Sequence, residues 1–375
     1  MKIGILKESS HENRVSMLPD GVSTLVDLKV SVLLESGAGK GSWISDELYK
    51  EAGAEILSRN EVIKQSDVLL MIDALSKDEI SSIPEGKVVI GAINPLTNHD
   101  LVKACAEAGI SMFSMDVIPR TTRAQAMDVL SSQATVAGYK AVLDAAWRLP
   151  GFLPMFMSAA GTIKPSKLLV LGAGVAGLQA IATARKLGAV VQAFDVRSAV
   201  KEEVLSLGAK FVEVEGARDE ATAGGYAVEQ TDEFKERQRK VIYDHCSKAD
   251  IIICTAQIPG REAPVLVTKE AVEAMRPGSV IIDLAAVSGG NCELTRNNEV
   301  VVEHEVTIVG QSNYPSTTPQ DASQMYGKNM INFLKLIIGE EGALNLNWED
   351  DLVEGTLVTH EKDIRHTRVK EFMNL

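Results

Sequence analysis

Three glycines in one short segment have the clearest chemical meaning in this sequence. The segment KLLVLGAGVAGLQAIATARKLGAVVQAFD contains the pattern GxGxxG at Gly172, Gly174 and Gly177, directly after an apolar stretch and directly before an amphipathic one. In such a strand–turn–helix context the first glycine turns the chain tightly, the second lets the backbone approach a pyrophosphate, and the third lets the helix pack on the strand. The helix N-terminus then faces the phosphate charge. Glycine-rich turns also occur for structural reasons alone, but the flanking elements favour a dinucleotide site.

An acidic residue follows at the position where such a site binds ribose. Asp195 ends the next apolar stretch, 23 positions after Gly172. A carboxylate there accepts hydrogen bonds from the adenosine ribose hydroxyls and repels a 2′-phosphate, which favours NAD over NADP. Arg197 lies close enough to accommodate a 2′-phosphate instead, but we expect the carboxylate at the strand end to dominate.

Polar side chains are concentrated in PRTTRAQAMDVLSSQATVAGY, residues 119–139. Arg120, Gln125, Asp128 and Ser131 have two interpretations. They are either the solvated start of a helix with a capping serine, or the polar lining of the cleft into which the nicotinamide half of a dinucleotide projects. The position of the segment, just before a helix that joins two domains, favours the second interpretation.

A second unusual segment, EGARDEATAGGYAVEQTD, covers Glu215 to Asp232. Its small residues surround Gly224 and Gly225, and Tyr226 is its only aromatic residue. It is either a disordered surface insertion or a lid that excludes water from a hydride-transfer site.

The elements that must position these residues follow a β/α alternation through most of the chain. In the first third, apolar strands alternate with helical segments, including helices near Asp46 to Glu55 and from His99 to Ala108, and no phosphate turn is present. The middle section contains six strands, LLVL, VVQAF, KFVEV, IIIC, SVIIDL and TIVG, which suit a dinucleotide-binding sheet. Long helices are predicted for Ala134 to Leu149 and Pro319 to Ile338, and LVEGTLVTHEKDI predicts a hairpin with its turn at EG.

The predicted fold class is therefore α/β, with two doubly wound Rossmann-like domains joined by two long helices. The first domain is discontinuous and comprises residues 1–133 and 330–375. The second is the NAD-binding domain with the connecting helices, residues 134–329.

Composition narrows the range of partners and compartments. The chain of 375 residues carries 51 acidic and 38 basic residues and a net charge of −13, the wrong sign for binding nucleic acid. Its four cysteines are scattered, which is typical of reduced thiols and argues against a metal site. The start, MKIGILKES, indicates a strand rather than a signal peptide, so a cytoplasmic location is expected.

Essentially the whole sequence resembles the NAD(H)-binding subunit of proton-translocating nicotinamide nucleotide transhydrogenases, in the family that also contains alanine dehydrogenase. Besides the glycine segment and the polar segment, the motifs that carry the resemblance are KESSHENRVSMLPDGV, ESGAGKGSWISD, AGGYA, TAQIPGREAPVLVT and GSVIIDLAAVSGGNCE.

The resemblance implies roles for individual residues. The polar loop that positions the nicotinamide end would comprise Arg120, Thr121, Thr122, Gln125, Asp128 and Ser131. The adenosine half would be held by Val175, Asp195, Val196 and Arg197. A mobile loop over the cofactor would include Gly225, Tyr226 and Gln238, and Gln257, where family members commonly have leucine, would lie near the nicotinamide ribose.

The resemblance also implies a reaction and partners. In that family a hydride passes directly from NADH on this subunit to NADP⁺ on a separate subunit, coupled to proton movement through a membrane subunit. Such a transfer requires oriented rings and the exclusion of water rather than a base. The chain would then be a homodimer in the cytoplasm, attached peripherally to the inner membrane through its partner subunits.

Two alternative functions compete with this interpretation. An alanine dehydrogenase would share the first motif with Arg14, but the positions of its lysine, histidine and aspartate are occupied here by Met71, Ala92 and Val287. No group is left to protonate or polarise a keto acid, so Arg14 is expected to be a structural ion-pair partner. The other alternative is a non-enzymatic redox sensor that binds NAD, for which the polar loop at the nicotinamide end would be unnecessary.

Overall fold

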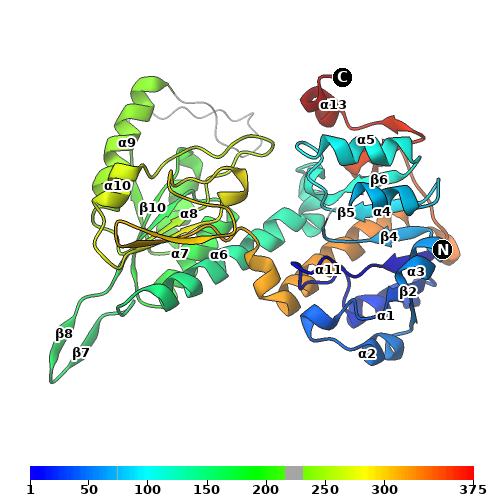
Figure 1. Cartoon of the computed structure of the whole chain (residues 1–375), viewed down its shortest axis with the longest axis horizontal. Coiled ribbons are helices and arrows are strands. Elements are labelled where there is room, and N and C mark those ends of the chain that lie inside the picture. The colour runs from blue at the N-terminus through cyan, green and yellow to red at the C-terminus, as the bar shows by residue number, and fades with distance from the viewer. Residues whose placement is uncertain (74, 215, 217–230) are drawn as a thin grey trace. The chain divides into compact units, whose positions relative to one another are not determined.

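The computed structural model of the chain describes residues 1–73, 75–214, 216 and 231–375 (Figure 1). The chain forms two compact units. Unit 1 comprises Met1–Gln133 and Pro315–Leu375, and unit 2 comprises Ala134–Tyr314. Each unit has a mainly parallel sheet with helices packed against it, which confirms the predicted α/β class with two Rossmann-like domains.

The sheet of unit 1 has eight strands in the order β17-β16-β6-β5-β4-β1-β2-β3. Strands β1 to β6 are parallel to one another, and β16 and β17 extend the sheet in antiparallel fashion. Their bounds are β1 Lys2–Ile5, β2 Ser31–Glu35, β3 Ala54–Leu57, β4 Val68–Leu70, β5 Val88–Gly91, β6 Ser111–Ser114, β16 Leu357–His360 and β17 Asp363–Ile364. The central strands are buried on both faces, as a parallel sheet covered by helices requires.

Helices cover both faces of this sheet. One face packs against α1 (Pro19–Asp27), α2 (Asp46–Glu51), α11 (Pro319–Ile337) and α12 (Asp351–Thr356), and the other against α3 (Arg59–Gln65), α4 (Lys77–Ser82), α5 (His99–Glu107) and α13 (Thr367–Met373). Helix α11 contributes Tyr326, Met330, Phe333 and Ile337 to the first of these cores. All four are essentially inaccessible to solvent.

Burial of α11 corrects the predicted domain arrangement. From the sequence, residues 315–329 are expected to belong to the second domain, with the helix from Pro319 as a connection. In the structure the whole helix lies within unit 1, and the chain re-enters that unit at the short 3-10 turn Tyr314–Thr317. The apolar stripe of α11 is needed to cover the sheet of unit 1. The local sequence does not show that this helix packs on a sheet formed by residues far away in the chain.

Two local predictions in unit 1 are wrong for identifiable reasons. Helix α2 ends at Glu51, and Ala54 and Glu55 belong to strand β3, a short edge strand whose alternation is too brief to recognise. The Glu354–Gly355 pair lies inside α12, which is capped by the Asp350 carboxylate. The hairpin turn is instead at Glu361 and Lys362, where two non-glycine residues adopt positive φ and give no Asn-Gly or Asp-Gly signal.

The sheet of unit 2 has seven strands in the order β11-β10-β9-β12-β13-β15-β14. The bounds are β9 Lys167–Leu171, β10 Val190–Phe194, β11 Lys210–Val212, β12 Ile251–Cys254, β13 Val280–Asp283, β14 Val300–Glu303 and β15 Val306–Val309. Six of these strands are parallel and correspond to the six predicted ones. The seventh, β14, pairs antiparallel with β15 through a turn at His304 and Glu305, again with positive φ at non-glycine residues, and is not among the predicted strands.

The helices that the structure describes in unit 2 cover its sheet in two groups. One face packs against α6 (Val129–Arg148), α7 (Val175–Lys186) and α8 (Lys201–Ser206), and the other against α9 (Asp232–Cys246) and α10 (Lys269–Glu273). Helix α6, predicted from Ala134, begins five residues earlier, still within unit 1, and continues into unit 2. Within unit 2, a Cβ on Gly138 of α6 would meet the Ala176 carbonyl oxygen at 2.1 Å, so α6 packs closely on the start of α7.

A two-stranded hairpin in unit 2 belongs to neither sheet core. Strands β7 (Phe156–Ser158) and β8 (Gly161–Ile163) pair antiparallel, and Figure 1 shows them extending away from the sheet of this unit. All six strand residues are exposed. The sequence does not predict this hairpin.

One acidic group in unit 1 is held in an unfavourable environment. The Glu8 carboxylate follows β1 and accepts hydrogen bonds from the backbone N–H groups of Ile72 and Asp73 at 2.8 and 3.0 Å. Burial raises the pKa of Glu8 from 4.5 to about 8, and the neighbouring Asp73 and Glu12 carboxylates act in the same direction. Unit 1 therefore contains a carboxyl group that is protonated near neutral pH.

Glu8 should make the protein less stable as the pH rises. Because the pKa is higher in the folded state than the ordinary value of 4.5, the folded chain binds the proton more tightly, and the free energy of unfolding falls as the pH rises from about 4.5 to about 8. We expect Glu8→Gln to remove roughly 2 kcal/mol of that fall. Urea unfolding at pH 5 and pH 8.5 measures it. The exposed Glu51→Gln serves as the control, and a pH dependence that is unchanged in Glu8→Gln would contradict the prediction.

Candidate functional site

The sheet order of unit 2 reverses between β9 and β12, which makes the ends of these two strands a topological switch point. These two strands are neighbours at the centre of the sheet, and the chain runs outward from them in opposite directions through β10 and β13. In open α/β sheets, ligands bind beyond the carboxyl ends of the strands at such a switch point. The glycine turn follows β9 directly, and the loop from Thr255 follows β12.

The glycine turn has the conformation that its residues require. Gly172 has φ of +100°, which a residue with a side chain rarely adopts. A Cβ on Gly177 would lie 1.9 Å from the Gly172 carbonyl oxygen. The third glycine therefore allows the first turn of α7 to pack directly against the end of β9.

Gly174 differs from the other two glycines. A Cβ built on it would meet no atom of the described residues within 4 Å, so none of them requires glycine there. Gly174 is the N-cap of the twelve-residue helix α7, whose first amides have no acceptor within the helix. An open cradle at the positive end of a helix fits the pyrophosphate of a dinucleotide. The exposed Val175 begins α7 beside it.

The Asp195 carboxylate lies at the end of β10, next to the glycine turn. Its Oδ2 accepts a hydrogen bond from the Ala173 N–H at 2.7 Å. Arg197 supplies three further bonds, from its backbone N–H and Nε to Oδ1, both at 2.9 Å, and from its guanidinium to Oδ2 at 2.7 Å. These four bonds occupy the four acceptor positions of a carboxylate, and the Asp195 side chain is only 6% exposed.

This pairing has a consequence for the predicted ribose role. Ribose hydroxyls can bond to Asp195 only if the Arg197 guanidinium moves away, since the other two donors are backbone amides. The pairing with Asp195 raises the pKa of Arg197 above its ordinary value, so the guanidinium is charged. Val196, between the two, is half-buried.

The loop after β12 is joined to the glycine turn by a side chain that the sequence does not single out. Thr255 Oγ1 donates a hydrogen bond to the Gly172 carbonyl oxygen at 2.7 Å. Gln257 is exposed, and its Nε2 donates to the Leu284 carbonyl oxygen at 2.9 Å. Asn291, also absent from the predicted site, is fully buried and bonds to the backbone of the same loop. A lone threonine and a lone asparagine carry no spacing signal that could have identified them.

The polar loop of unit 1 divides into buried anchors and exposed polar residues. Ala124 and Met127 are buried, and the Ala126 carbonyl oxygen accepts hydrogen bonds from Asn329 and Asn332 of α11 at 2.8 and 2.9 Å. Exposed residues of the loop are Arg120, Thr121, Thr122 and Gln125. Helix α11 thus fixes a short 3-10 turn, Thr122–Met127, that presents polar side chains.

Asp128 caps a helix. A capped helix start is one of the two interpretations that the sequence of this segment allows. Its Oδ1 accepts the Ser131 N–H at 2.9 Å and its Oδ2 accepts the Ser131 hydroxyl at 2.5 Å. Asp128 therefore caps the start of α6, as an N-cap carboxylate does. The capping residue is the aspartate and not a serine, and Ser131 is its partner.

Of the three residues predicted for the mobile loop, the structure describes only Gln238. Gln238 is half-buried on α9. Gly225 and Tyr226, which are expected in the mobile loop, lie outside the described residues.

Arg14, shared with the alanine dehydrogenase motif, is committed to partners inside unit 1. Its Nε and one terminal nitrogen bond to the two oxygens of Glu12 at 2.8 and 2.6 Å, and its other terminal nitrogen bonds to Gln133 Oε1 at 2.8 Å. All three nitrogens of the guanidinium are used, and both side chains of the ion pair are buried. Arg14 is therefore the structural ion-pair residue that the sequence predicts.

The three positions that replace the alanine dehydrogenase groups carry no polar side chain. Met71 is buried, with its backbone carbonyl oxygen bonded to the Tyr326 hydroxyl at 2.8 Å. Val287 is 65% exposed in the 3-10 turn Ala286–Ser288, shortly after β13. Among the described residues, no group of three or more histidine, cysteine, aspartate or glutamate side chains is placed to hold a metal ion.

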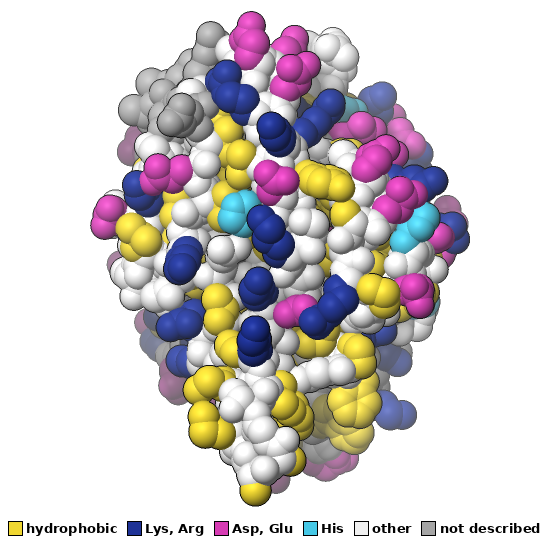
Figure 2. Space-filling model, turned by 90° about the vertical axis from the view of Figure 1, so that its left-hand side faces the viewer, with side chains coloured by type: hydrophobic (Ala, Val, Ile, Leu, Met, Phe, Trp, Pro, Cys, Tyr) yellow, Lys and Arg dark blue, Asp and Glu magenta, His cyan; other side chains and the backbone are white. Residues whose placement is uncertain are grey.

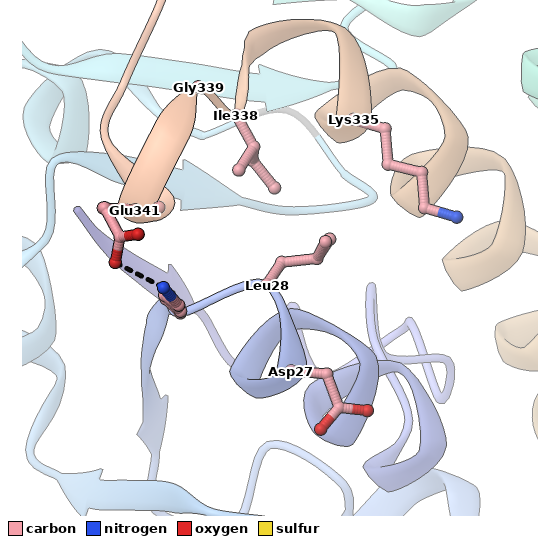
Figure 3. Close-up of a pocket in the computed structure, with 8 residues that line it drawn as sticks. Asp27, Leu28, Lys335, Ile338, Gly339 and Glu341 are labelled. Carbon is pink, nitrogen blue, oxygen red and sulfur yellow. Dashed lines mark hydrogen bonds and ion pairs between the residues drawn. The ribbon is translucent and has the colours of Figure 1, made fainter.

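A surface depression of about 270 Å³ lies elsewhere, in unit 1 (Figure 3). Figure 3 shows the side chains of Leu28 and Ile338 facing each other, and the nearby Glu341 forms an ion pair with Lys29, which also lines the depression. Lys29 lies just before β2, so the depression is at the amino-terminal edge of the sheet, where open α/β sheets do not bind their ligands. Within the part of the chain that the structure describes, no helix is both long and apolar enough to cross a membrane.

Comparisons with known proteins agree with this geometry. The family model "Alanine dehydrogenase/PNT, N-terminal domain" matches residues 4–137, and "Alanine dehydrogenase/PNT, C-terminal domain" matches residues 141–367. An NAD(P) transhydrogenase alpha subunit of Rhodospirillum rubrum is 46% identical over 98% of both chains. The structure of a transhydrogenase from Sinorhizobium meliloti superposes with a TM-score of 0.89 at 45% identity, over 97% of this chain and all of the other.

Alanine dehydrogenase is a more distant relative. The enzyme of Bacillus subtilis is 27% identical over 86% of this chain and 82% of its own. The chain therefore belongs to the alanine dehydrogenase/PNT family and is a homologue of the alpha subunits of NAD(P) transhydrogenase.

Proposed function

We propose that this chain is the NAD(H)-binding component of a proton-translocating transhydrogenase and passes a hydride from NADH directly to NADP⁺ held on a partner subunit. The observation that carries the proposal is the open cradle at Gly174 with Asp195 beside it, in a homologue of transhydrogenase alpha subunits. Reduced nicotinamide, when bound, supplies the hydride itself. The protein then has to bind, orient and exclude water, because no proton leaves a substrate in this reaction.

Each half of the cofactor has candidate partners. The amides at the start of α7 would bind the pyrophosphate, and Asp195, Val196 and Arg197 would surround the adenosine. Arg120 and Gln125 would bind the carboxamide end of the nicotinamide, with Thr121 and Thr122 along the same loop. Asp128 and Ser131 would act on the ring through the loop, because their side chains bond to each other at the start of α6. Gly225, Tyr226 and Gln238 would cover the cofactor, and Gln257 would lie near its second ribose.

Oxidative deamination of alanine is the less favoured alternative. Its substrate carboxylate would need a cationic partner, and the Arg14 guanidinium already bonds to Glu12 and Gln133. A non-enzymatic NAD sensor would bind NADH without transferring its hydride. An assay of NADH oxidation by an NADP⁺ analogue distinguishes the transhydrogenase from the alanine dehydrogenase and from the sensor. For the transhydrogenase, the oxidation should occur only when a matching NADP-binding subunit is added.

The proposed assembly has two further kinds of partner. A transhydrogenase of this type needs an NADP-binding subunit and a membrane subunit through which protons move. The relatives named as alpha subunits support partner subunits in general. We propose that this chain lies at the cytoplasmic side of the inner membrane and is held there by those subunits.

The β7–β8 hairpin supports a homodimer. Residues 150–163 contain no charged side chain, and Phe156 stacks on Phe152 with ring centroids 5.5 Å apart. Met157 is 70% exposed, and Met155 and Ile163 are exposed nearby. Figure 2 shows hydrophobic side chains gathered at the lower end of the face, where Figure 1 places the hairpin. An isolated two-stranded hairpin is only marginally stable in water, and an uncharged apolar arm fits an identical arm of a second copy.

Substitution of Asp195 should change the nucleotide preference in two ways. Asp195→Ala removes the acceptor for the ribose hydroxyls and also releases the Arg197 guanidinium, which can then pair with a 2′-phosphate. We expect NADH to bind roughly tenfold more weakly and NADPH to bind more tightly. Fluorescence titrations of both nucleotides measure this change. The gain for NADPH should disappear in Asp195→Ala/Arg197→Ala, and equal NADH affinities in the wild type and Asp195→Ala would refute the ribose role.

Substitution of Gln125 should separate transfer from binding. Gln125 is exposed on the anchored 3-10 turn, so Gln125→Ala should leave the fold intact. We expect the rate of hydride transfer to an NADP⁺ analogue, with the partner subunit present, to fall by roughly tenfold or more while NADH affinity changes little. Stopped-flow transfer and equilibrium titration provide the two measurements. The exposed Gln320→Ala of the same unit is the control, and a loss confined to NADH affinity would show that the loop only binds.

A charge on the hairpin should dissociate the dimer. Met157→Glu places a carboxylate on an exposed position of β7, where it cannot disturb the core, and introduces like charges into the proposed contact between two copies. Light scattering after size exclusion should show a dimer for the wild type and a monomer for the variant. Val302→Glu, at another exposed apolar position of unit 2, should remain dimeric. A monomeric wild type would rule out the homodimer.

A further inference from the structure

A buried asparagine closes the loop that follows β12. Asn291 is fully inaccessible to solvent, although it lies in the loop after β13 rather than in a strand. Its Oδ1 accepts the Ala256 N–H at 2.9 Å, and its Nδ2 donates to the carbonyl oxygens of Ala256 and Pro264, each at 2.8 Å. One side chain therefore fixes both the beginning and the end of the segment between Ala256 and Pro264.

The backbone of Asn291 completes the closure. Its carbonyl oxygen accepts hydrogen bonds from the N–H groups of Leu266 and Val267 at 2.8 and 2.9 Å. Both donors of its amide nitrogen are used, and its amide oxygen is bonded. Such a saturated set orients the side chain in one way only.

Asn291 is itself held by Asp283, the last residue of β13. Asp283 is fully buried, and its Oδ2 accepts hydrogen bonds from the N–H groups of Asn291 and Cys292 and from the Thr295 hydroxyl, at 2.7 to 2.9 Å. The Ala285 N–H donates to its Oδ1 at 3.0 Å. The loop after β12 is thus fixed to the sheet through two consecutive buried polar groups.

The same loop adjoins the glycine turn. The Thr255 hydroxyl bonds to the Gly172 carbonyl oxygen, and a Cβ on Gly172 would lie 3.0 Å from the Ala256 nitrogen. The Thr255–Gly172 bond does not involve Asn291, so loss of the Asn291 side chain should release the loop beyond Ala256 and leave the glycine turn in place.

The sheet order decides which half of a dinucleotide this loop adjoins. Asp195 follows β10, the glycine turn follows β9, and the closed loop follows β12, on the other side of β9 from β10. A dinucleotide lies across the crevice at this switch point. With its adenosine ribose near Asp195, its second nucleoside half lies on the β12 side.

We infer that Asn291 is a positioning residue which holds the segment Gln257–Ala263 in place for the nicotinamide-ribose half of NADH. The inference rests on the NADH site proposed above. It adds that this wall of the site is set by one buried amide, which itself does not touch the cofactor. Of the two faces of the crevice, only the β12 side should depend on it.

Two ligands separate this role from a general effect on the fold. ADP contains the adenosine and the pyrophosphate of NADH, and lacks its second ribose and its nicotinamide. In Asn291→Ala, and in the isosteric Asn291→Asp, which loses both donors, we expect NADH to bind roughly tenfold more weakly. ADP should bind within about twofold of its wild-type affinity, since Asp195 and the glycine turn are retained. Calorimetric titration of the whole chain measures both.

Thr295→Val is the matched control. It removes one hydrogen bond from the same Asp283 carboxylate but none from the loop, so both ligands should keep their affinity. A position-specific readout accompanies the titrations: Arg261 is exposed in the loop, and trypsin should cleave after it faster in the Asn291 variants than in Thr295→Val.

The possible results are distinguishable. Equal weakening of NADH and ADP, or an equal loss in Thr295→Val, would overturn the positioning role and leave Asn291 as a support of the sheet edge. Unchanged NADH affinity together with faster cleavage at Arg261 would also overturn it, because the loop would then be irrelevant to the cofactor. A wild-type chain that binds ADP and NADH equally well would overturn it in the same way. Failure of the wild type to bind either ligand would overturn the proposed NADH site itself.

Discussion

The close approach of the Gly177 backbone to the Gly172 carbonyl oxygen is the constraint on which the candidate site depends. A single Cβ at Gly177 would lie 1.9 Å from that oxygen, so any side chain would push α7 away from the end of β9. Both the amides at the start of α7 and the Ala173 N–H that holds Asp195 would move with it. The Thr255 hydroxyl bonds to the same carbonyl oxygen and extends this contact to the loop after β12. One steric requirement thus aligns three regions of the site.

Asp195 and Arg197 form a second, electrostatic constraint. In the structure the carboxylate has no remaining acceptor position, because the guanidinium and two backbone amides use them all. Binding of a ribose therefore exchanges charge-assisted hydrogen bonds inside the protein for bonds to the ligand. Such an exchange keeps the net gain in free energy small. A small net gain would suit the proposed transhydrogenase, which has to release its nucleotide after each transfer.

The two units have the same order of six parallel strands, but only unit 2 has a phosphate turn among the described residues. In unit 1, β1 is followed by a long segment with Glu8, Glu12 and Arg14, whose polar groups bond to one another or to other groups of unit 1. The Arg14 guanidinium, which the alanine dehydrogenase motif shares, is thereby committed to Glu12 and Gln133. Fold and family alone would allow either enzyme, whereas the bonding of this one arginine favours the transhydrogenase.

The sequence by itself determined the parallel strands other than β3, the glycine turn and the acid after β10, because each depends on local spacing and apolar periodicity. It also indicated the polar loop, although not that Asp128 caps α6. Tertiary structure alone decided the rest. The hairpin turns at Glu361 and His304 have no glycine signal, since sheet pairing holds non-glycine residues at positive φ there. The assignment of α11 to unit 1, the Arg197–Asp195 pairing and the closure of the β12 loop by Asn291 depend on which distant groups meet when the sheets form, and spacing along the chain does not encode that.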